Sequence, residues 1–367
     1  MRAALLERSS EPLSVVDDVT VAEPGPGEVL VRVTHCGLCH SDLSFVNGTF
    51  PTMAPTVLGH EAAGIVEQPG PGVAGLGVGD KVVLSPVAAC DSCYWCLRGE
   101  YGVCVNAAAV SMGTFVDGRT PLARGGAPVL RGLGVGGLAE FAVVTASAAV
   151  RVADDTPLEV ACVIGCAVQT GVGAVLNTAK VEPGATVLVM GAGGVGIAIA
   201  QGARIAGAAQ IIVSDPIPAR REAALQFGAT DVIDPTNENV AIRSHELTGG
   251  IGVDYAFEAV GLGSLVETGL FATRNGGTTV MVGAGGLDQN VSLAPAVMYV
   301  TSERKLMGSF LGGCNARRDI PRLLDLWRAG RLDLEGMISQ RRPLAEVNEA
   351  FADLTASRGI RTVLQVS

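Results

Sequence analysis

The chain has 367 residues, which is more than one hydrophobic core usually organises, so two domains are expected. Apolar residues make up 48% and charged residues 17%, which argues against a disordered chain. The formal net charge of -10 argues against nucleic acid as a partner, because binding to phosphates requires a basic surface. Residues 1–10 lack the apolar stretch of a signal peptide, and the apolar runs fall short of the roughly 20 residues that span a bilayer. We therefore expect a globular, cytoplasmic protein that binds neither nucleic acid nor membrane.

The chain changes character near residue 156. Up to about residue 152, short β-rich runs such as 29–33 and 81–84 are separated by Pro-Gly turns, which predicts an irregular β domain. After a helical stretch that begins near residue 157, strands alternate with helices, as in the βαβ units of a parallel sheet. The predicted strands are 186–190, 210–214, 231–233, 253–257 and 278–282. Helices at 320–329 and 344–356 and a strand at 361–366 complete the chain.

Four cysteines follow one another closely in the spacing Cys90-x2-Cys93-x2-Cys96-x7-Cys104. Nine cysteines without an export signal indicate a reducing compartment, where thiols bind metal more often than they form disulfides. Four thiolates within reach of one another favour a tetrahedral zinc ion, with disulfides or chance clustering as the alternatives. Because four protein ligands leave no open position for a substrate, this zinc is expected to be structural.

A second group of metal-binding side chains includes Cys36, Cys39 and three histidines. His35 and His40 flank the two cysteines, and His60 follows in the sequence Gly-His-Glu. Spacing alone does not identify a site here. Cys36-x2-Cys39 could be a redox pair or two metal ligands, and each histidine could be an ordinary surface or packing residue.

A glycine-rich turn follows the predicted strand 186–190. Such a strand, turn and helix start bind a dinucleotide, although a turn without a ligand is the alternative reading. Asp215 ends the next strand, where a carboxylate accepts hydrogen bonds from the adenosine ribose and repels a ribose phosphate. NAD is therefore favoured over NADP, although Arg220 and Arg221 lie nearby. The turn comprises Gly191, Gly193, Gly194, Val195 and Gly196.

Taken together, these motifs resemble those of the zinc-containing medium-chain alcohol dehydrogenases. The resemblance rests on Cys39-x-Ser41-Asp42, Gly59-His60-Glu61-Ala-Ala-Gly64, the four-cysteine segment and the glycine turn, and it covers essentially the whole chain. The long segment between Cys104 and Phe141 is similar to that of the animal-liver type. The implied fold is α/β, with a GroES-like, β-rich catalytic domain at 1–168 and 312–367 and a Rossmann domain at 169–311. The active site is expected in a cleft between the domains, and the chain is expected to form a homo-oligomer through the Rossmann domain, a dimer or a tetramer.

The resemblance also implies roles for the second group of side chains. Cys39, His60 and Cys166 become the protein ligands of a catalytic zinc whose fourth position stays open for water or the substrate oxygen. Asp42 matches a carboxylate that orients the ligand histidine. Glu61 matches a residue that can approach the zinc from behind.

Ser41 matches the hydroxyl that takes the alcohol proton and passes it towards the cofactor ribose. The sequence departs from the liver pattern at Ser44, where that pattern has a histidine at the end of the proton relay. A serine cannot act as a base near neutral pH, so a basic pH optimum is expected. Cys36 and Cys162 match no ligand position and are expected to be small buried residues.

Cationic side chains are expected at the cofactor. By resemblance, His40 and Arg361 would contact the pyrophosphate, and Thr170 would pack against the nicotinamide. A histidine is partly neutral at working pH, so cofactor binding through His40 is expected to depend on pH. His245 lies in a polar stretch, is expected to be solvated, and receives no role.

The implied function is reversible hydride transfer between a primary alcohol and NAD, with two zinc ions per chain. Pro86 falls where the liver pattern has an aromatic wall, so the pocket would accept aromatic or long-chain alcohols. One alternative is a thiol-dependent formaldehyde dehydrogenase, although 47–57 lacks the acidic residue that those enzymes use. Another is an alcohol dehydrogenase with permanently bound NAD. From a different class, the chain could be a catalytically silent NAD-binding protein. A zinc-free quinone reductase of the same superfamily is disfavoured, because it would have no need of the four cysteines.

Overall fold

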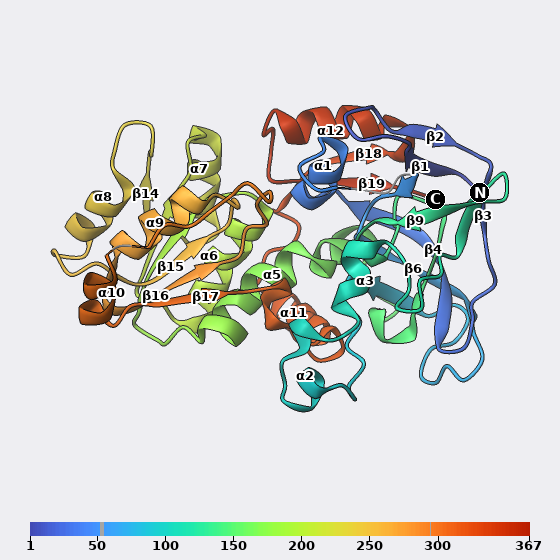
Figure 1. The fold of residues 1–367 in the computed structure, drawn as a ribbon, viewed down its shortest axis with the longest axis horizontal. Helices are drawn as coiled ribbons and strands as arrows, with labels where there is room; N and C mark the ends of the chain where they lie inside the picture. The colour runs from blue at the N-terminus through green and yellow to red at the C-terminus, as the bar shows by residue number, and fades with distance from the viewer. Residues whose placement is uncertain (52–54, 294) are drawn as a thin grey trace. The chain divides into compact units, whose positions relative to one another are not determined.

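In the computed structural model, residues 1–51, 55–293 and 295–367 are described (Figure 1). The chain divides into two compact units. The first comprises Met1–Ala167, Asn315–Gly330 and Leu334–Ser367, and the second comprises Val168–Cys314 and Arg331–Asp333. The first unit ends one residue before the expected limit of 168 and resumes three residues after the expected 312, and one further segment changes unit. The segment Arg331–Asp333 belongs to the second unit, because Gln201 exchanges two hydrogen bonds with the backbone of Asp333 at 2.7 and 3.1 Å.

The described part of the first unit contains two β-sheets, as the turn-rich N-terminal sequence predicts. One has the strand order β2-β1-β5-β9-β8-β3, and the other has the order β11-β7-β6-β4-β19-β18 with β10 paired to β4. Alternating apolar residues, such as Val29, Val31 and Val33, are buried between the layers. The strands are β1 Ala3–Leu6, β2 Ser14–Val16, β3 Val19–Val21, β4 Glu28–Gly37, β5 Thr56–Val57, β6 Glu61–Pro69, β7 Lys81–Leu84, β8 Leu122–Arg124, β9 Ala127–Arg131, β10 Phe141–Thr145, β11 Ala149–Arg151, β18 Ile338–Pro343 and β19 Arg361–Gln365.

Short helices connect these strands and place the functional side chains at strand ends. The C-terminal helix α12 contacts α1, so the last residues of the chain pack beside an early segment. The helices of this unit, with α5 at the boundary, are α1 His40–Val46, α2 Tyr94–Leu97, η1 Tyr101–Val103, α3 Ala107–Met112, η2 Gly132–Gly134, η3 Ala146–Ala148, α4 Leu158–Ala161, η4 Cys162–Gly165, α5 Ala167–Gly173, α11 Ala316–Arg328, η7 Leu344–Glu346 and α12 Val347–Thr355.

The second unit is built on one parallel sheet with the order β14-β13-β12-β15-β16-β17, and Figure 1 shows β15, β16 and β17 side by side. This order is that of a Rossmann fold, and the strand order reverses between β12 and β15, where such folds bind their ligands. The strands are β12 Thr186–Met190, β13 Gln210–Ser214, β14 Asp231–Ile233, β15 Val253–Glu258, β16 Thr273–Met281 and β17 Lys305–Gly308. The helices are η5 Ala174–Ala179, α6 Gly194–Ala206, α7 Pro218–Gln226, α8 Val240–Leu247, α9 Gly263–Ala272, α10 Ala296–Ser302 and η6 Leu311–Gly313.

The expected fold class, a GroES-like β domain with a Rossmann domain, is confirmed. The predicted strand at 278–282 begins earlier, at Thr273, and the helix predicted at 320–329 begins at Ala316. Within the described residues, no single helix is long and apolar enough to cross a membrane. Only the pair Leu158–Gly165 and Ala167–Ala179, bent by 53°, meets the length and composition test together.

Candidate active site

The four cysteines of the segment 90–104 converge on one point. Their sulfur atoms all lie within 4.8 Å of one another, with 4.0 Å between Cys90 and Cys96 and 3.9 Å between Cys93 and Cys104. A tetrahedral zinc ion about 2.3 Å from each sulfur places the sulfurs about 3.8 Å apart. The geometry therefore fits one zinc ion in a closed site of four thiolates.

Backbone N–H groups donate to two of the four sulfurs, although burial raises the pKa of Cys96 to about 12 and also raises that of Cys104. The amide of Cys93 donates to the Cys90 sulfur at 3.3 Å, and the amides of Cys90 and Asn106 donate to the Cys104 sulfur at 3.4 and 3.5 Å. The N–H and O–H groups of Ser92 lower the pKa of Cys90 to about 6. A thiolate is the form that binds metal.

The segment 90–104, here called the four-cysteine lobe, contacts α11. Arg317 forms an ion pair with Asp91, and the guanidinium of Arg318 lies 5.8 Å from the centre of the Tyr101 ring. Figure 1 shows α2 of this lobe beside α11. Since α11 comes more than 200 residues later in the chain, the lobe helps to hold two distant segments of the first unit together.

A second cluster of metal-binding groups is buried in the first unit. Cys39, His60, Glu61 and Cys166 each offer a ligand atom, and these atoms lie within 4.8 Å of one another. Cys39 is 5% exposed, His60 1% and Cys166 9%. Two thiols and an imidazole in a buried setting match the donors that zinc prefers. The described residues thus contain both metal sites that the resemblance implies.

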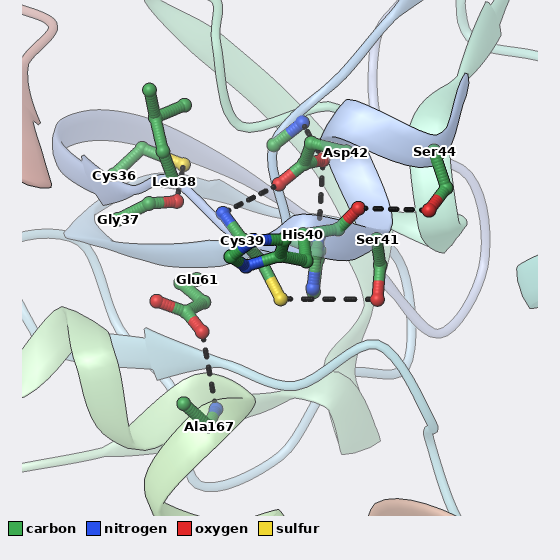
Figure 2. Close-up of polar contacts among 12 residues, drawn as sticks. Cys36, Gly37, Leu38, Cys39, His40, Ser41, Asp42, Ser44, Glu61 and Ala167 are labelled. Carbon is green, nitrogen blue, oxygen red and sulfur yellow. Dashed lines mark hydrogen bonds and ion pairs between the residues drawn. The ribbon is translucent and has the colours of Figure 1, made fainter. Parts of the chain in front are cut away.

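Asp42 connects Cys39 and His60, and Figure 2 shows its carboxylate bonded to the backbone of Cys39. Its Oδ1 lies 3.1 Å from His60 Nδ1 and accepts from the Gly59 amide at 2.9 Å, while its Oδ2 accepts from the Cys39 amide at 3.2 Å. This arrangement places the proton on Nδ1 of His60 and leaves Nε2 as the metal ligand. Gly59 has φ +91, and a Cβ there would lie 2.7 Å from Leu138, so only glycine fits before His60.

Ser41 and Ser44 differ in what they can do. The Ser41 hydroxyl lies 3.8 Å from the Cys39 sulfur, a contact drawn as a dashed line in Figure 2. The Ser44 hydroxyl instead donates to the carbonyl of His40, one helical turn earlier, at 3.0 Å. Ser44 is therefore engaged with its own helix.

Glu61 lies between Arg361 and the other three metal-binding groups, which are Cys39, His60 and Cys166. Its Oε1 accepts from the Ala167 amide at 3.1 Å (Figure 2), and its Oε2 lies 3.5 Å from Arg361 Nε. Burial raises the pKa of Glu61 to about 8. Arg361 is 4% exposed and also donates to the carbonyl of Leu38 at 2.6 Å. Nothing in the sequence indicates this pair, which is separated by 300 positions, and the contact of Arg361 with pyrophosphate stays a prediction.

The cysteines near this cluster divide into ligands and packing residues. A hydrogen bond from Cys166 holds the pKa of Cys39 well below its usual range and raises that of Cys166. Cys36 and Cys162 are both 0% exposed, and burial raises the pKa of each thiol. The prediction that these two are small buried residues is confirmed.

The glycine turn of the second unit is shaped for a phosphate. Gly193 precedes α6 with no side-chain cap, so the first amides of the helix remain available, and a Cβ at Gly193 would meet open space. Gly196 packs so tightly that a Cβ would overlap the carbonyl of Gly191. Val195, between these glycines, is half-buried. The turn therefore fits the pyrophosphate of a dinucleotide.

Asp215 directly follows β13 and lies beside this turn. Its Oδ2 accepts from the Ala192 amide at 2.8 Å and its Oδ1 accepts from the Ile217 amide at 2.9 Å, so the carboxylate is fixed in place. Arg220 approaches it at 4.0 Å, whereas Arg221 pairs with Asp234 at 2.8 Å. The adenosine ribose of NAD would meet a carboxylate that already neutralises Arg220.

Replacing Asp215 by asparagine is expected to raise the KM for NAD about tenfold or more, because charged hydrogen bonds to the ribose are lost. The KM for NADP should fall relative to the KM for NAD, since the carboxylate that repels the ribose phosphate of NADP is gone. Steady-state kinetics with both cofactors measures this change. The variant Asp231→Asn, on the neighbouring β14, is the control and should leave both constants unchanged. Unaltered cofactor preference in Asp215→Asn would refute the role.

The remaining predicted residues are placed as follows. His40 is exposed at the first residue of α1, and Thr170 is 7% exposed in α5. Their contacts with the cofactor stay predictions. His245 is partly exposed, and its ring nitrogens lie 3.3 and 3.0 Å from the carbonyls of Gly250 and Phe271, so it is solvated in part and also contacts the backbone.

Comparisons with known proteins agree with this geometry. Residues 25–154 match the alcohol dehydrogenase GroES-like domain, and 194–329 match the zinc-binding dehydrogenase domain. S-(hydroxymethyl)glutathione dehydrogenase of Synechocystis sp. is 36% identical over 99% of both chains. A zinc-binding alcohol dehydrogenase protein from Burkholderia ambifaria superposes with a TM-score of 0.94 at 34% identity, covering 100% of this chain and 98% of that one. Benzyl alcohol dehydrogenase from Acinetobacter calcoaceticus has a TM-score of 0.94 at 29% identity, covering 100% and 99%.

The fold and the two sulfur-rich sites define a zinc-dependent oxidoreductase with a Rossmann domain. The chain belongs to the zinc-containing medium-chain alcohol dehydrogenase family. Its residues fit the two zinc ions and the dinucleotide cofactor that the sequence predicts.

Proposed function

We propose that this protein catalyses the reversible oxidation of primary alcohols, with NAD as the hydride acceptor. The observation that carries the proposal is the buried donor set of Cys39, His60 and Cys166 with the Ser41 hydroxyl beside it. Glu61, the fourth group within 4.8 Å, accepts from the Ala167 amide and lies against Arg361, so three protein ligands remain and leave a position for substrate, which is the pattern of catalytic zinc sites.

Each residue of this set has a distinct task. A zinc ion bound there supplies a Lewis acid that favours the deprotonated form of the alcohol, and two thiolates offset its charge. Asp42 holds His60 in the tautomer that presents Nε2. Ser41 accepts the alcohol proton through its hydroxyl and passes it on.

The proton leaves the site without a histidine at position 44. The Ser44 hydroxyl donates its hydrogen to the carbonyl of His40, and a serine is not a base near neutral pH, so Ser44 does not replace the histidine at the end of the relay. We infer that water carries the proton from Ser41 to solvent, which explains the basic pH optimum expected for this enzyme.

The substitution Ser44→His is expected to raise kcat several-fold near neutral pH and to move the pH profile towards lower pH. A histidine with a pKa of about 6.5 is neutral, and so able to accept the proton, above that pH. Below a pH of about 6.5 the histidine is protonated and cannot accept the proton, so kcat should be no higher than with serine. The control Ser44→Ala should leave the profile unchanged. A profile that is identical in Ser44→His and the unaltered protein would contradict the proposed relay.

We propose aromatic or long-chain primary alcohols as substrates. Pro86 falls where the liver pattern has an aromatic wall, so the pocket would be wider at that position. The solved benzyl alcohol dehydrogenase that superposes on the whole chain supports an aromatic substrate. Of the segment 47–57, residues 52–54 lie outside the described residues.

A second candidate is the oxidation of the adduct of formaldehyde and glutathione. It is favoured by curated relatives at 36% identity over 99% of the chain, which are named S-(hydroxymethyl)glutathione dehydrogenase. The segment 47–57 argues against this candidate, because it contains no acidic residue that could bind the amino group of glutathione. We therefore rank it below the simple alcohols.

We also propose a cytoplasmic homodimer formed through the Rossmann domain. The nine cysteines are all free, as expected in a reducing compartment. Strand β17 lies at the end of its sheet in the described part of the chain, and Phe310, just after it, is 51% exposed. An edge strand with apolar neighbours suits pairing with a second copy.

NADH formation should be measured with purified protein and free NAD over ethanol, octanol, benzyl alcohol, cinnamyl alcohol, and formaldehyde with glutathione. The proposal predicts turnover that ranks benzyl, cinnamyl and octyl alcohols above ethanol. Turnover confined to formaldehyde with glutathione would establish the second candidate instead. If protein with both zinc ions shows no turnover, two alternatives remain. One is an alcohol dehydrogenase with permanently bound NAD, which denaturation would release in detectable form, and the other is a catalytically silent protein.

A further inference from the structure

Arg131, at the end of β9, is a buried cation outside the two metal sites. It is 3% exposed, and its Nη1 donates to the carbonyls of Gly134 at 2.9 Å and Val143 at 3.0 Å. Its Nε is buried and has no hydrogen-bond partner among the described residues. Since a guanidinium has five N–H groups, the edge that contains Nε and Nη2 is left for another acceptor.

No carboxylate lies within ion-pairing distance of Arg131 in the described structure. The two nearby acids, Glu28 and Asp117, both bind Arg119, at 2.5 and 3.0 Å, and Glu28 also accepts from the amide of Gly25. The Phe115 ring covers one face of the Arg131 guanidinium at 3.7 Å but cannot accept from its edge. Burial without a counter-ion lowers the pKa of Arg131 to about 10.

Arg131 lines a cavity of about 40 Å³ within the first unit. Its other lining residues are mostly apolar, including Pro86, Ala88 and Ala148, and the polar ones are Asn106 and Thr145. About 10–15 Å³ is enough to hold one water molecule, so this cavity has room for a small ion but not for an aromatic acid. A buried cation with free N–H groups in a small, largely apolar cavity favours an anion.

We propose that this cavity is a binding site for a small monovalent anion, either chloride or a short carboxylate such as formate, held by the Nε and Nη2 edge of Arg131. The anion supplies the negative charge that Glu28 and Asp117 give to Arg119. It also stabilises the turn at η2, where Arg131 bonds to Gly134 and Leu133 has the left-handed φ 53. Pro86 lines this cavity and is also placed in the proposed substrate pocket, so the tests of the anion site measure binding of the anion rather than turnover and can fail independently of the proposed function.

Crystals of the complete protein soaked in sodium bromide, with data collected at the bromine absorption edge, test the site directly. The proposal predicts an anomalous peak at hydrogen-bond distance from Nε or Nη2 of Arg131. The peak should be absent from Arg131→Gln and from Ala148→Val, which fills the cavity and keeps the cation. Should Arg131→Gln not fold, Ala148→Val decides the matter. If the unaltered protein shows no anomalous peak at Arg131, the cavity holds only water and the proposal is overturned.

A thermal unfolding titration then distinguishes the ligands in solution. Chloride and formate are titrated separately at constant ionic strength, with gluconate as the balancing anion that is too large to enter. A saturable rise of about 2 °C is expected with whichever anion binds, and none in Ala148→Val. The control Arg124→Gln removes an arginine that pairs with Glu7 and Asp18 and does not line the cavity, and it should keep the rise. An equal rise in all variants would be a general salt effect and would overturn the proposal, as would a peak only at soaking concentration.

Discussion

Replacing Cys39 by alanine is expected to leave one zinc ion per chain and to lower kcat for alcohol oxidation by at least about a thousandfold. Cys39 supplies one of three sulfur and nitrogen ligands, and its removal leaves His60 and Cys166 too few to hold the metal. The fold should persist, because Cys39 packs at a helix start and its backbone bond to Asp42 does not need the thiol. Zinc analysis and steady-state kinetics on the same preparation measure both effects.

The matched control is Cys36→Ala. Cys36 lies three residues earlier, is fully buried, and has no place in the donor cluster of the described residues. This variant should retain two zinc ions and kcat within a few-fold, with a stability loss of about 1 kcal/mol from the small cavity. If Cys36→Ala lost zinc while Cys39→Ala kept it, the assignment of the ligands would be wrong.

Replacing Cys96 by alanine is expected to destabilise the protein strongly, and more than Cys39→Ala does. The four thiolates form a closed site, and structural zinc contributes its binding energy directly to folding. We expect the thermal midpoint to fall by about 10 °C or more and the lobe to become sensitive to proteases. Activity of the protein that remains folded should fall far less than in Cys39→Ala, because the two metal sites use different ligands.

Tyr94→Ala is the control for the lobe. Tyr94 is 67% exposed in α2, between two zinc ligands, and stacks on Trp95 without contributing a ligand. Its loss should move the midpoint by no more than about 2 °C. Scanning calorimetry and limited proteolysis compare the two variants. A Cys96→Ala protein as stable and as protease-resistant as Tyr94→Ala would show that the lobe needs no metal.

The elements that could be predicted from the sequence are those with local signals. Strands β12 and β13 appear with the predicted bounds because each is a short apolar run closed by a glycine turn or an acid. The four-cysteine site is also local, since all its ligands lie within 15 residues. Close spacing forces such ligands together once the lobe closes.

The ligands of the second site could not be separated from their neighbours by spacing. Cys162 and Cys166 are four residues apart, and only the family resemblance favoured Cys166. The structure shows the physical reason. Cys162 starts η4 and its thiol donates to the carbonyl of Glu159, whereas Cys166 has φ -138 and ψ -74, which breaks the helix and turns its sulfur to Cys39.

Contacts between distant segments carried no signal in the sequence. Glu61 meets Arg361 because β6 and β19 both pair with β4, a consequence of sheet topology that a single sequence does not reveal. Arg131, at the end of β9, likewise meets Phe115 because the Arg131 amide donates to the carbonyl of Gly113 just before that ring. Such pairs are fixed by tertiary structure, so they lie beyond reasoning from local pattern.

The most direct test of a catalytic zinc is to follow NADH formation from benzyl alcohol while a chelator removes zinc from the purified protein. We predict two zinc ions per chain at the start, loss of all activity as the zinc content falls from two to one, and recovery when zinc is added back. The open three-ligand site should release its ion before the closed four-thiolate site does. Activity that persists in protein with one zinc ion or none would contradict a catalytic zinc at Cys39, His60 and Cys166.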